Sequence, residues 1–258
     1  MKLWIADKKY LPCYLLFCLF FSLIVTVITF FGVWLMNQAS EKETFQQPSK
    51  AEPALPIVVI DAGHGGEDGG AVGKNGIYEK DLNLSIAKHL NEMLRACGVQ
   101  TVMTRTEDIL LYDRNSDYKG QKKVQDLATR REIAERYENA VFISIHMNAF
   151  PEAQYSGLQV YYSKNDPNSS LLAQTVQAMV KNTLLPENDR TIKPAGSNIY
   201  LLDRLDCPAV LIECGFLSNP QECERLSEEA YRLQLARVLC ASILEYLSES
   251  EKNPVSDT

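Results

Sequence analysis

Two histidines in this sequence stand where their side chains could share one metal ion. His64 follows the apolar run Ile57–Ile60 and lies among five glycines, and His146 closes the mostly apolar run Val141–Ile145. In open α/β sheets functional groups gather where strands end, and glycine lets the backbone approach a ligand closely. We therefore expect both imidazoles at one edge of a sheet.

Glu79, just before a predicted helix, is the third candidate ligand. Zinc in hydrolases typically takes three protein ligands, such as two histidines and one glutamate, and leaves the fourth position for water. His64, Glu79 and His146 match that set, so we expect them to bind Zn²⁺. The alternative for Glu79 is an ordinary acidic residue that the macrodipole favours at a helix N-terminus. His89, in the middle of the same helix, is expected to be half-buried or on the surface.

Glu213 is a carboxylate at the end of a very apolar run, Ala209–Ile212. A carboxylate beside a core strand is costly unless it is paired or functional. We assign Glu213 as the general base, which takes a proton from the attacking water and later passes it to the leaving amine.

Asn148, Arg105 and Arg131 are the candidates for substrate contacts. Asn148, two residues after His146, could hydrogen-bond to a glycan or a peptide, or could cap a turn, and both interpretations stay open. The two arginines could pair with substrate carboxylates, although arginines at the ends of helices or strands are more often solvated.

The glycine-rich segment around His64 does not fit the nucleotide-binding patterns. A phosphate loop needs G-x-x-x-x-G-K-[ST], and a dinucleotide site needs G-x-G-x-x-G opening directly into a helix. Glu67 and Asp68 would also repel a phosphate. A formal net charge of −7 argues against nucleic acid as a partner.

Apolar runs and amphipathic stretches alternate along residues 56–250. Between Asp81 and Cys97, for example, apolar residues recur every four positions, which predicts a helix. The alternation predicts an α/β fold: one domain with a mixed, mostly parallel sheet of about six strands and helices on both faces. The expected strands are 57–60, 99–104, 141–146, 157–162, 198–202 and 209–213, and the expected helices are 81–97, 123–137, 168–184 and 220–247.

The N-terminal part of the sequence predicts a membrane anchor. Residues 11–36 carry no charged side chain, and at about 1.5 Å per residue such a helix covers a bilayer core of roughly 30 Å. A secretory signal peptide is the alternative, although its apolar region is usually shorter. Lysines before the run predict a single-pass protein of the cell membrane, with a cytoplasmic N-terminus and an extracytoplasmic catalytic domain. The expected parts are a cytoplasmic segment 1–10, the anchor 11–36, a linker 37–55, the catalytic domain 56–250 and a disordered tail 251–258.

Cysteines beyond the predicted anchor form no C-x-x-C pair, so a zinc ribbon or a thioredoxin site has no support. We interpret Cys97 and Cys240 as small buried apolar groups. Cys207 and Cys214 flank the proposed site, and the sequence leaves their redox state open.

The candidate residues lie within longer sequence segments between Ile57 and about Leu247. In these segments the chain resembles the zinc-dependent N-acetylmuramoyl-L-alanine amidases. The resemblance places the zinc ligands of that family on His64, Glu79 and His146, and its catalytic glutamate on Glu213. Ala62 and Thr191 depart from the family pattern without touching a ligand. The segments are IDAGHGGEDGGA at 60–71, YEKDLNLSIAKHL at 78–90, Thr104-Arg105, VFISIHMNAF at 141–150 and PAVLIECGFLSNPQE at 208–222.

The resemblance implies hydrolysis of the amide between N-acetylmuramic acid and L-alanine in peptidoglycan. The chain looks most like the spore-cortex, germination-specific type, whose members remove stem peptides so that a separate deacetylase can form muramic δ-lactam. The implied partners are glycan strands with peptide stems and that downstream deacetylase, and the need for an activating partner protein stays open. The alternatives are a non-catalytic peptidoglycan-binding scaffold of the same fold and a zinc-dependent sugar deacetylase.

Overall fold

The computed structural model describes residues 19–31, 56–115 and 120–252. The chain divides into two compact units, Met1–Ala54 and Leu55–Thr258. The expected segment 1–10 and linker 37–55 lie outside the described residues, as do positions 253–258 of the expected tail. Positions 251 and 252 belong to the last helix instead.

The predicted membrane anchor over residues 11–36 is wrong. Among the described residues, no helix combines the length and the apolar character needed to cross a bilayer, which takes about 20 residues. Within the predicted anchor, helix is described only over residues 19–31, and its other residues lie outside the described ranges. We had no other basis for the single-pass location in the cell membrane or for the orientation inferred from the flanking charges. These two predictions are therefore also wrong.

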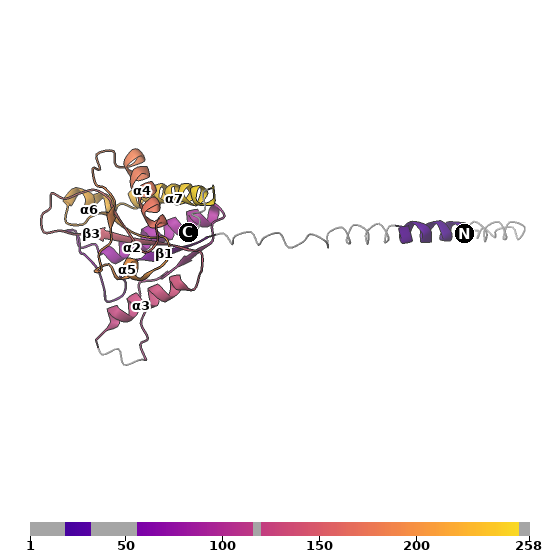
Figure 1. Ribbon diagram of the computed structural model, residues 1–258, viewed down its shortest axis with the longest axis horizontal. Helices are drawn as coiled ribbons and strands as arrows, with labels where there is room; N and C mark the ends of the chain where they lie inside the picture. The colour runs from indigo at the N-terminus through magenta and orange to yellow at the C-terminus, as the bar shows by residue number, and fades with distance from the viewer. Residues whose placement is uncertain (1–18, 32–55, 116–119, 253–258) are drawn as a thin grey trace, which may run out of the picture. The chain divides into compact units, whose positions relative to one another are not determined.

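The second unit is built on one mixed sheet with the strand order β2-β1-β3-β6-β4-β5 (Figure 1). Its centre is parallel, because β1 pairs with β2 and β3, and β3 pairs with β6. β4 runs antiparallel to β6 and pairs in parallel with β5. The predicted six-stranded mixed sheet of a single α/β domain is confirmed. The strands are β1 (Ile57–Ala62), β2 (Thr101–Met103), β3 (Ala140–Asn148), β4 (Gln159–Tyr162), β5 (Lys193–Pro194) and β6 (Ala209–Phe216).

Helices cover both faces of this sheet, which explains why the central strands are apolar on both sides. Val58 and Ile60 of β1 belong to the core beneath α2, α4 and α7, whereas Val59 faces the core beneath α3 and α5. Figure 1 shows these two layers on opposite sides of the sheet. The helices are α2 (Glu79–Ala96), α3 (Lys122–Glu135), α4 (Asn168–Thr183), α5 (Tyr200–Arg204), α6 (Pro220–Ser227) and α7 (Glu229–Lys252).

The strand predicted at 198–202 is wrong, since this segment forms α5 and the edge strand β5 precedes it. Leu201, Leu202 and Leu205 are buried in the core beneath α5. Leu201 and Leu205 are four residues apart, and that spacing places two side chains on one face of a helix.

The long final helix predicted over 220–247 is two helices. The backbone of Glu228 is extended (φ −80°, ψ 124°) and separates α6 from α7. Arg232 stabilises the break because its Nη1 donates to the carbonyl oxygens of Leu226 and Ser227, both at 2.8 Å. Carbonyls in the last turn of a helix otherwise lack a partner within that helix.

The cysteines of the described residues are all free thiols, and Cys207 and Cys214 are not bonded to each other. Cys240 is buried, as predicted, but Cys97 is exposed. Cys97 is the first residue after α2, and its exposed thiol contacts that of Cys240 on α7.

Candidate metal and hydrolytic site

The two histidines leave the sheet at the same edge. β1 and β3 are parallel, with Ala62 opposite Ile145, so the residues that follow them emerge side by side. His146 belongs to the last part of β3, and His64 stands in the loop after β1. Glu79 opens α2, and its backbone N–H donates to the carbonyl of Ala71 in the same loop at 2.9 Å.

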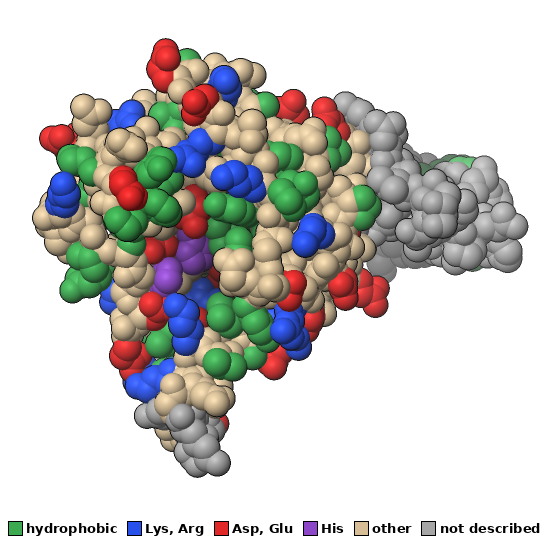
Figure 2. Space-filling model, turned by 60° about the vertical axis from the view of Figure 1, so that its left-hand side comes forward, with side chains coloured by type: hydrophobic (Ala, Val, Ile, Leu, Met, Phe, Trp, Pro, Cys, Tyr) green, Lys and Arg blue, Asp and Glu red, His purple; other side chains and the backbone are tan. Residues whose placement is uncertain are grey.

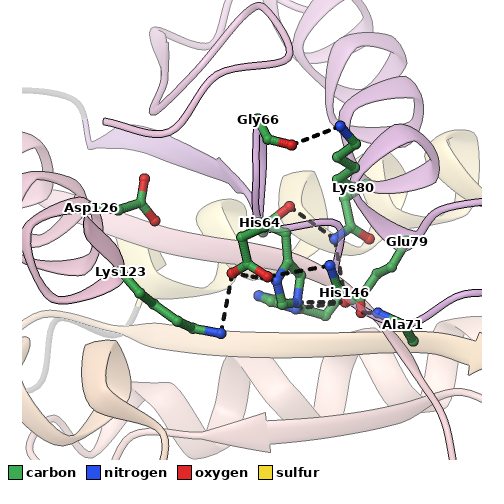
Figure 3. Close-up of polar contacts among 12 residues, drawn as sticks. His64, Gly66, Ala71, Glu79, Lys80, Lys123, Asp126 and His146 are labelled. Atoms are coloured by element: carbon green, nitrogen blue, oxygen red, sulfur yellow. Dashed lines mark hydrogen bonds and ion pairs between the residues drawn. The ribbon is translucent and has the colours of Figure 1, made fainter. Parts of the chain in front are cut away.

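The side chains of His64, Glu79 and His146 converge (Figure 3). Glu79 Oε1 lies 3.2 Å from His64 Nε2 and 2.9 Å from His146 Nδ1. One ligand atom from each of the three residues lies within 4.8 Å of the others, and these residues form the candidate metal site. Backbone donors also fix the carboxylate, since Met147 N–H donates to Oε1 at 3.0 Å and Ala71 N–H to Oε2 at 2.8 Å.

The electrostatics of this cluster favour a bound cation. Burial alone would raise the pKa of Glu79, but hydrogen bonds from His146 and His64 hold it well below its usual range. Burial alone would lower the pKa of His64, but contacts with Asp68 and Glu79 raise it to about 9. The imidazolium of His64 thus balances the carboxylates in the protein alone, and a metal ion would take the place of its proton.

Glu213 lies beside the cluster because it is the register partner of His146 on the neighbouring parallel strand β6. Burial raises the pKa of Glu213 to about 7; His146 and His64 lower it by smaller amounts, and Glu79 raises it. Its Oε2 is buried and has no hydrogen-bond partner among the described residues. An unpartnered carboxylate oxygen with this pKa can accept a proton from water at neutral pH.

A cleft of about 250 Å³ opens over these residues. Its lining includes the polar side chains of His64, His146 and Glu213 and the largely apolar residues 199–202 and Leu211. Figure 2 shows histidine side chains in a hollow of the surface, with acidic and basic side chains around it. Lys123 stands at the rim and pairs with Asp68 at 3.1 Å (Figure 3).

Beneath the cleft lies a buried ion-pair network that the sequence analysis did not identify. Asp61 accepts hydrogen bonds from Thr104 Oγ1, Ser144 Oγ and Arg130 Nη1 at 2.7, 2.6 and 2.7 Å. Burial alone would raise the pKa of Asp61, but Arg130 and the hydroxyl donors lower it below its usual value. Arg130 also donates to the carbonyl oxygen of His64 at 2.7 Å, so the network supports the backbone of a candidate ligand.

The only sequence signal for this network was the spacing of Asp126 and Arg130 on α3. Arg130 Nε donates to Asp126 Oδ2 at 2.8 Å across one helical turn, a spacing that favours ion pairs. The neighbouring Arg131, a candidate substrate contact from the sequence, pairs with Glu135 at 3.3 Å instead.

Asn148 and His89 do not belong to the cluster of candidate metal ligands. Asn148 ends β3, where the pairing with β6 shifts after His146, and its carbonyl accepts from Leu217 N–H at 2.8 Å. Its contact with a substrate stays a prediction. His89 is half-buried on α2, with Nε2 3.8 Å from Glu229 Oε1.

Comparison with known proteins identifies the family. A family model described as N-acetylmuramoyl-L-alanine amidase matches residues 58–245. The chain belongs to this amidase family. Both the family and the likeness to its spore-cortex type, expected from the motifs, are confirmed by the relatives described next.

Several relatives match this chain over most of their own length. The germination-specific N-acetylmuramoyl-L-alanine amidase of Bacillus subtilis is 34% identical over 198 residues, which cover 77% of this chain and 82% of the relative. The CwlD amidase of Clostridioides difficile, solved in complex with the GerS lipoprotein, is 38% identical with a TM-score of 0.71, covering 75% of this chain and 99% of that one. The amidase AmiC2 of Nostoc punctiforme is 32% identical with a TM-score of 0.65, covering 76% of this chain and 99% of that one.

Proposed function

We propose that this chain hydrolyses the amide bond between N-acetylmuramic acid and L-alanine in peptidoglycan, as a zinc enzyme. The observation that carries the proposal is the convergence of His64, Glu79 and His146 within 4.8 Å, beside the unpartnered oxygen of Glu213, in a member of the amidase family. We assign the activity to residues 56–250.

His64, Glu79 and His146 would hold the zinc ion. Two imidazoles and one carboxylate are a common ligand set of catalytic zinc, with one position left open. The ion, when bound, would polarise the scissile carbonyl and lower the pKa of the attacking water. The short contacts that Glu79 makes with both imidazoles support this assignment, because ligand atoms of one ion must lie this close together.

Glu213 would move the protons of the reaction. As the general base it accepts a proton from the attacking water, and as the general acid it then delivers that proton to the departing nitrogen of L-alanine. A pKa of about 7 suits both steps, because the group can accept and release a proton at neutral pH. Asn148, at the end of β3, would donate a hydrogen bond to the substrate.

The likeness to the germination-specific amidase and to CwlD supports a role in the spore cortex. In that role the chain would remove stem peptides from glycan strands, and a deacetylase acting afterwards would allow muramic δ-lactam to form. The CwlD structure contains a lipoprotein partner, so we propose that a partner protein also acts on this chain.

The test incubates the full chain and zinc with purified muropeptides and identifies the new chemical groups. New amino termini of L-alanine are expected from the wild type. Glu213→Gln should lose this activity, while Glu224→Gln, an exposed residue of α6, should retain it. Release of acetate would indicate a sugar deacetylase, and tight binding without any turnover would indicate a scaffold. Either result would overturn the proposal.

A further inference from the structure

Arg105 follows β2 and is almost completely buried, with 2% of its surface exposed. Its guanidinium donates only to backbone carbonyls among the contacts that the structure records. Nε donates to Ala62 O at 2.8 Å, Nη2 to Gly63 O at 3.0 Å and Lys80 O at 2.9 Å, and Nη1 to Glu107 O at 3.0 Å. The arginine is therefore neither solvated nor directed at a substrate carboxylate, the two roles considered from the sequence.

The partners of Arg105 belong to two segments that carry candidate metal ligands. Ala62 and Gly63 immediately precede His64, and Lys80 immediately follows Glu79. One guanidinium is thus bonded to both segments through carbonyls next to the ligands. Because that group is planar and rigid, its donors fix the distance and the angle between the two segments, which a flexible ammonium cannot do.

The His64 segment needs such support because its backbone is strained. His64 is the only residue other than glycine with a positive φ, 61°, in the described part of the chain. This conformation costs an ordinary residue about 1 to 2 kcal/mol, and it persists only where the surroundings hold it. Asn83 Nδ2 donates to the same Gly63 carbonyl at 3.1 Å, so the support comes from α2 as well as from Arg105.

We propose that Arg105 is a positioning residue for the metal site, which sets the spacing of His64 and Glu79 before the ion binds. This role rests on the metal centre of the proposed function. Burial beside Arg130 lowers the pKa of Arg105 to about 10, so its fork remains charged and fully donating at neutral pH. Loss of the Arg105 guanidinium leaves the fold in place, but His64 and Glu79 are then no longer held at a fixed spacing. The affinity for zinc falls as a result.

The chain offers a matched control in Arg232. Like Arg105, it donates to backbone carbonyls, in its case those of Leu226 and Ser227, and it also contacts Ser85 Oγ at 2.8 Å. Those partners carry no candidate metal ligand. Replacing Arg232 therefore removes the same kind of hydrogen bond and leaves the metal site untouched.

The experiment measures zinc affinity of the full chain by competition with a chromogenic chelator, for the wild type, Arg105→Lys, Arg105→Ala and Arg232→Lys. Loss of a group that orients a metal ligand typically costs 10- to 100-fold in affinity. We expect a loss of about this size for both Arg105 variants and an unchanged value for Arg232→Lys. Millimolar methylguanidinium should restore zinc binding to Arg105→Ala. In the metal-free protein, hydrogen exchange of Arg105→Lys should rise at residues 62–66 and 79–81 and not at the core strands.

Wild-type affinity in Arg105→Lys would overturn the proposal, and so would an equal loss in Arg232→Lys, since the effect would then be one of general stability. A wild-type chain that binds no zinc would also overturn it. A chain whose zinc affinity depends on Arg105 but that releases no stem peptide would support the positioning role and overturn the proposed function. Arg105→Lys keeps the test decisive if Arg105→Ala does not fold.

Discussion

Glu213→Gln should abolish activity and at the same time stabilise the metal-free protein. Burial raises the pKa of Glu213 from 4.5 to about 7, and each pKa unit corresponds to about 1.4 kcal/mol. The ionised carboxylate therefore lowers the free energy of unfolding by up to about 3 kcal/mol above pH 7. This figure is an upper limit, since solvent reaches part of the residue.

The sign of this effect depends on pH. Below pH 4.5 the carboxyl group is protonated in both the folded and the unfolded protein, so the variant and the wild type should be equally stable. Between pH 4.5 and 7 the unfolded wild type loses its proton first, and the wild type becomes progressively less stable than the variant. The difference should be constant above that range.

Urea unfolding of both metal-free proteins at pH 5 and pH 8 measures this difference. Glu222→Gln is the control, because that buried glutamate accepts from the N–H groups of Phe216 and Gly157 at 2.8 and 3.0 Å. Removing its charge weakens these bonds and should destabilise the protein by about 1 to 3 kcal/mol. A Glu213→Gln variant no more stable than the wild type at pH 8 would refute our account of Glu213 as a buried, unpartnered carboxylate.

Three further predictions concern the metal site and its support. Gly63→Ala should abolish zinc binding in a chelator competition, because an added Cβ would overlap the ring of His146; unchanged affinity would contradict this packing. Arg130→Met should lower the free energy of unfolding by about 3 to 5 kcal/mol, since it leaves the buried Asp61 and Asp126 without their partner, and a smaller loss in urea unfolding would show that water reaches these carboxylates. Zinc at about 100 times its dissociation constant should raise the free energy of unfolding by about 2.7 kcal/mol, and an unchanged melting temperature would argue against the site.

Strand-end residues were predictable from the sequence because their signal is local. Each of His146 and Glu213 follows a largely apolar run, which predicts that each stands at the end of a strand. The structure places them in register on β3 and β6. Their roles as metal ligand and base remain predictions that the experiments above address.

The supporting layer could not be predicted because it depends on contacts between distant segments. Arg130 reaches Asp61, 69 positions away, and Arg105 reaches Ala62, 43 positions away. Nothing in the neighbouring residues distinguishes these buried arginines from the half-buried Arg131. The prediction for the α5 segment was wrong for another reason. The segment has five residues, and in so short an apolar run the periodicity of a strand cannot be distinguished from that of a helix.

The central position of β3 in the sheet has a consequence for the chain while it is being synthesised. His146 joins Glu79 across 67 positions of the chain, and β6, which brings Glu213, follows later still. A nascent chain that ends at α2 contains His64 and Glu79. It lacks β3 with His146 and β6 with Glu213, so it cannot form the complete candidate site. Hydrolytic competence would then arise only after β6 has been synthesised and has paired with β3.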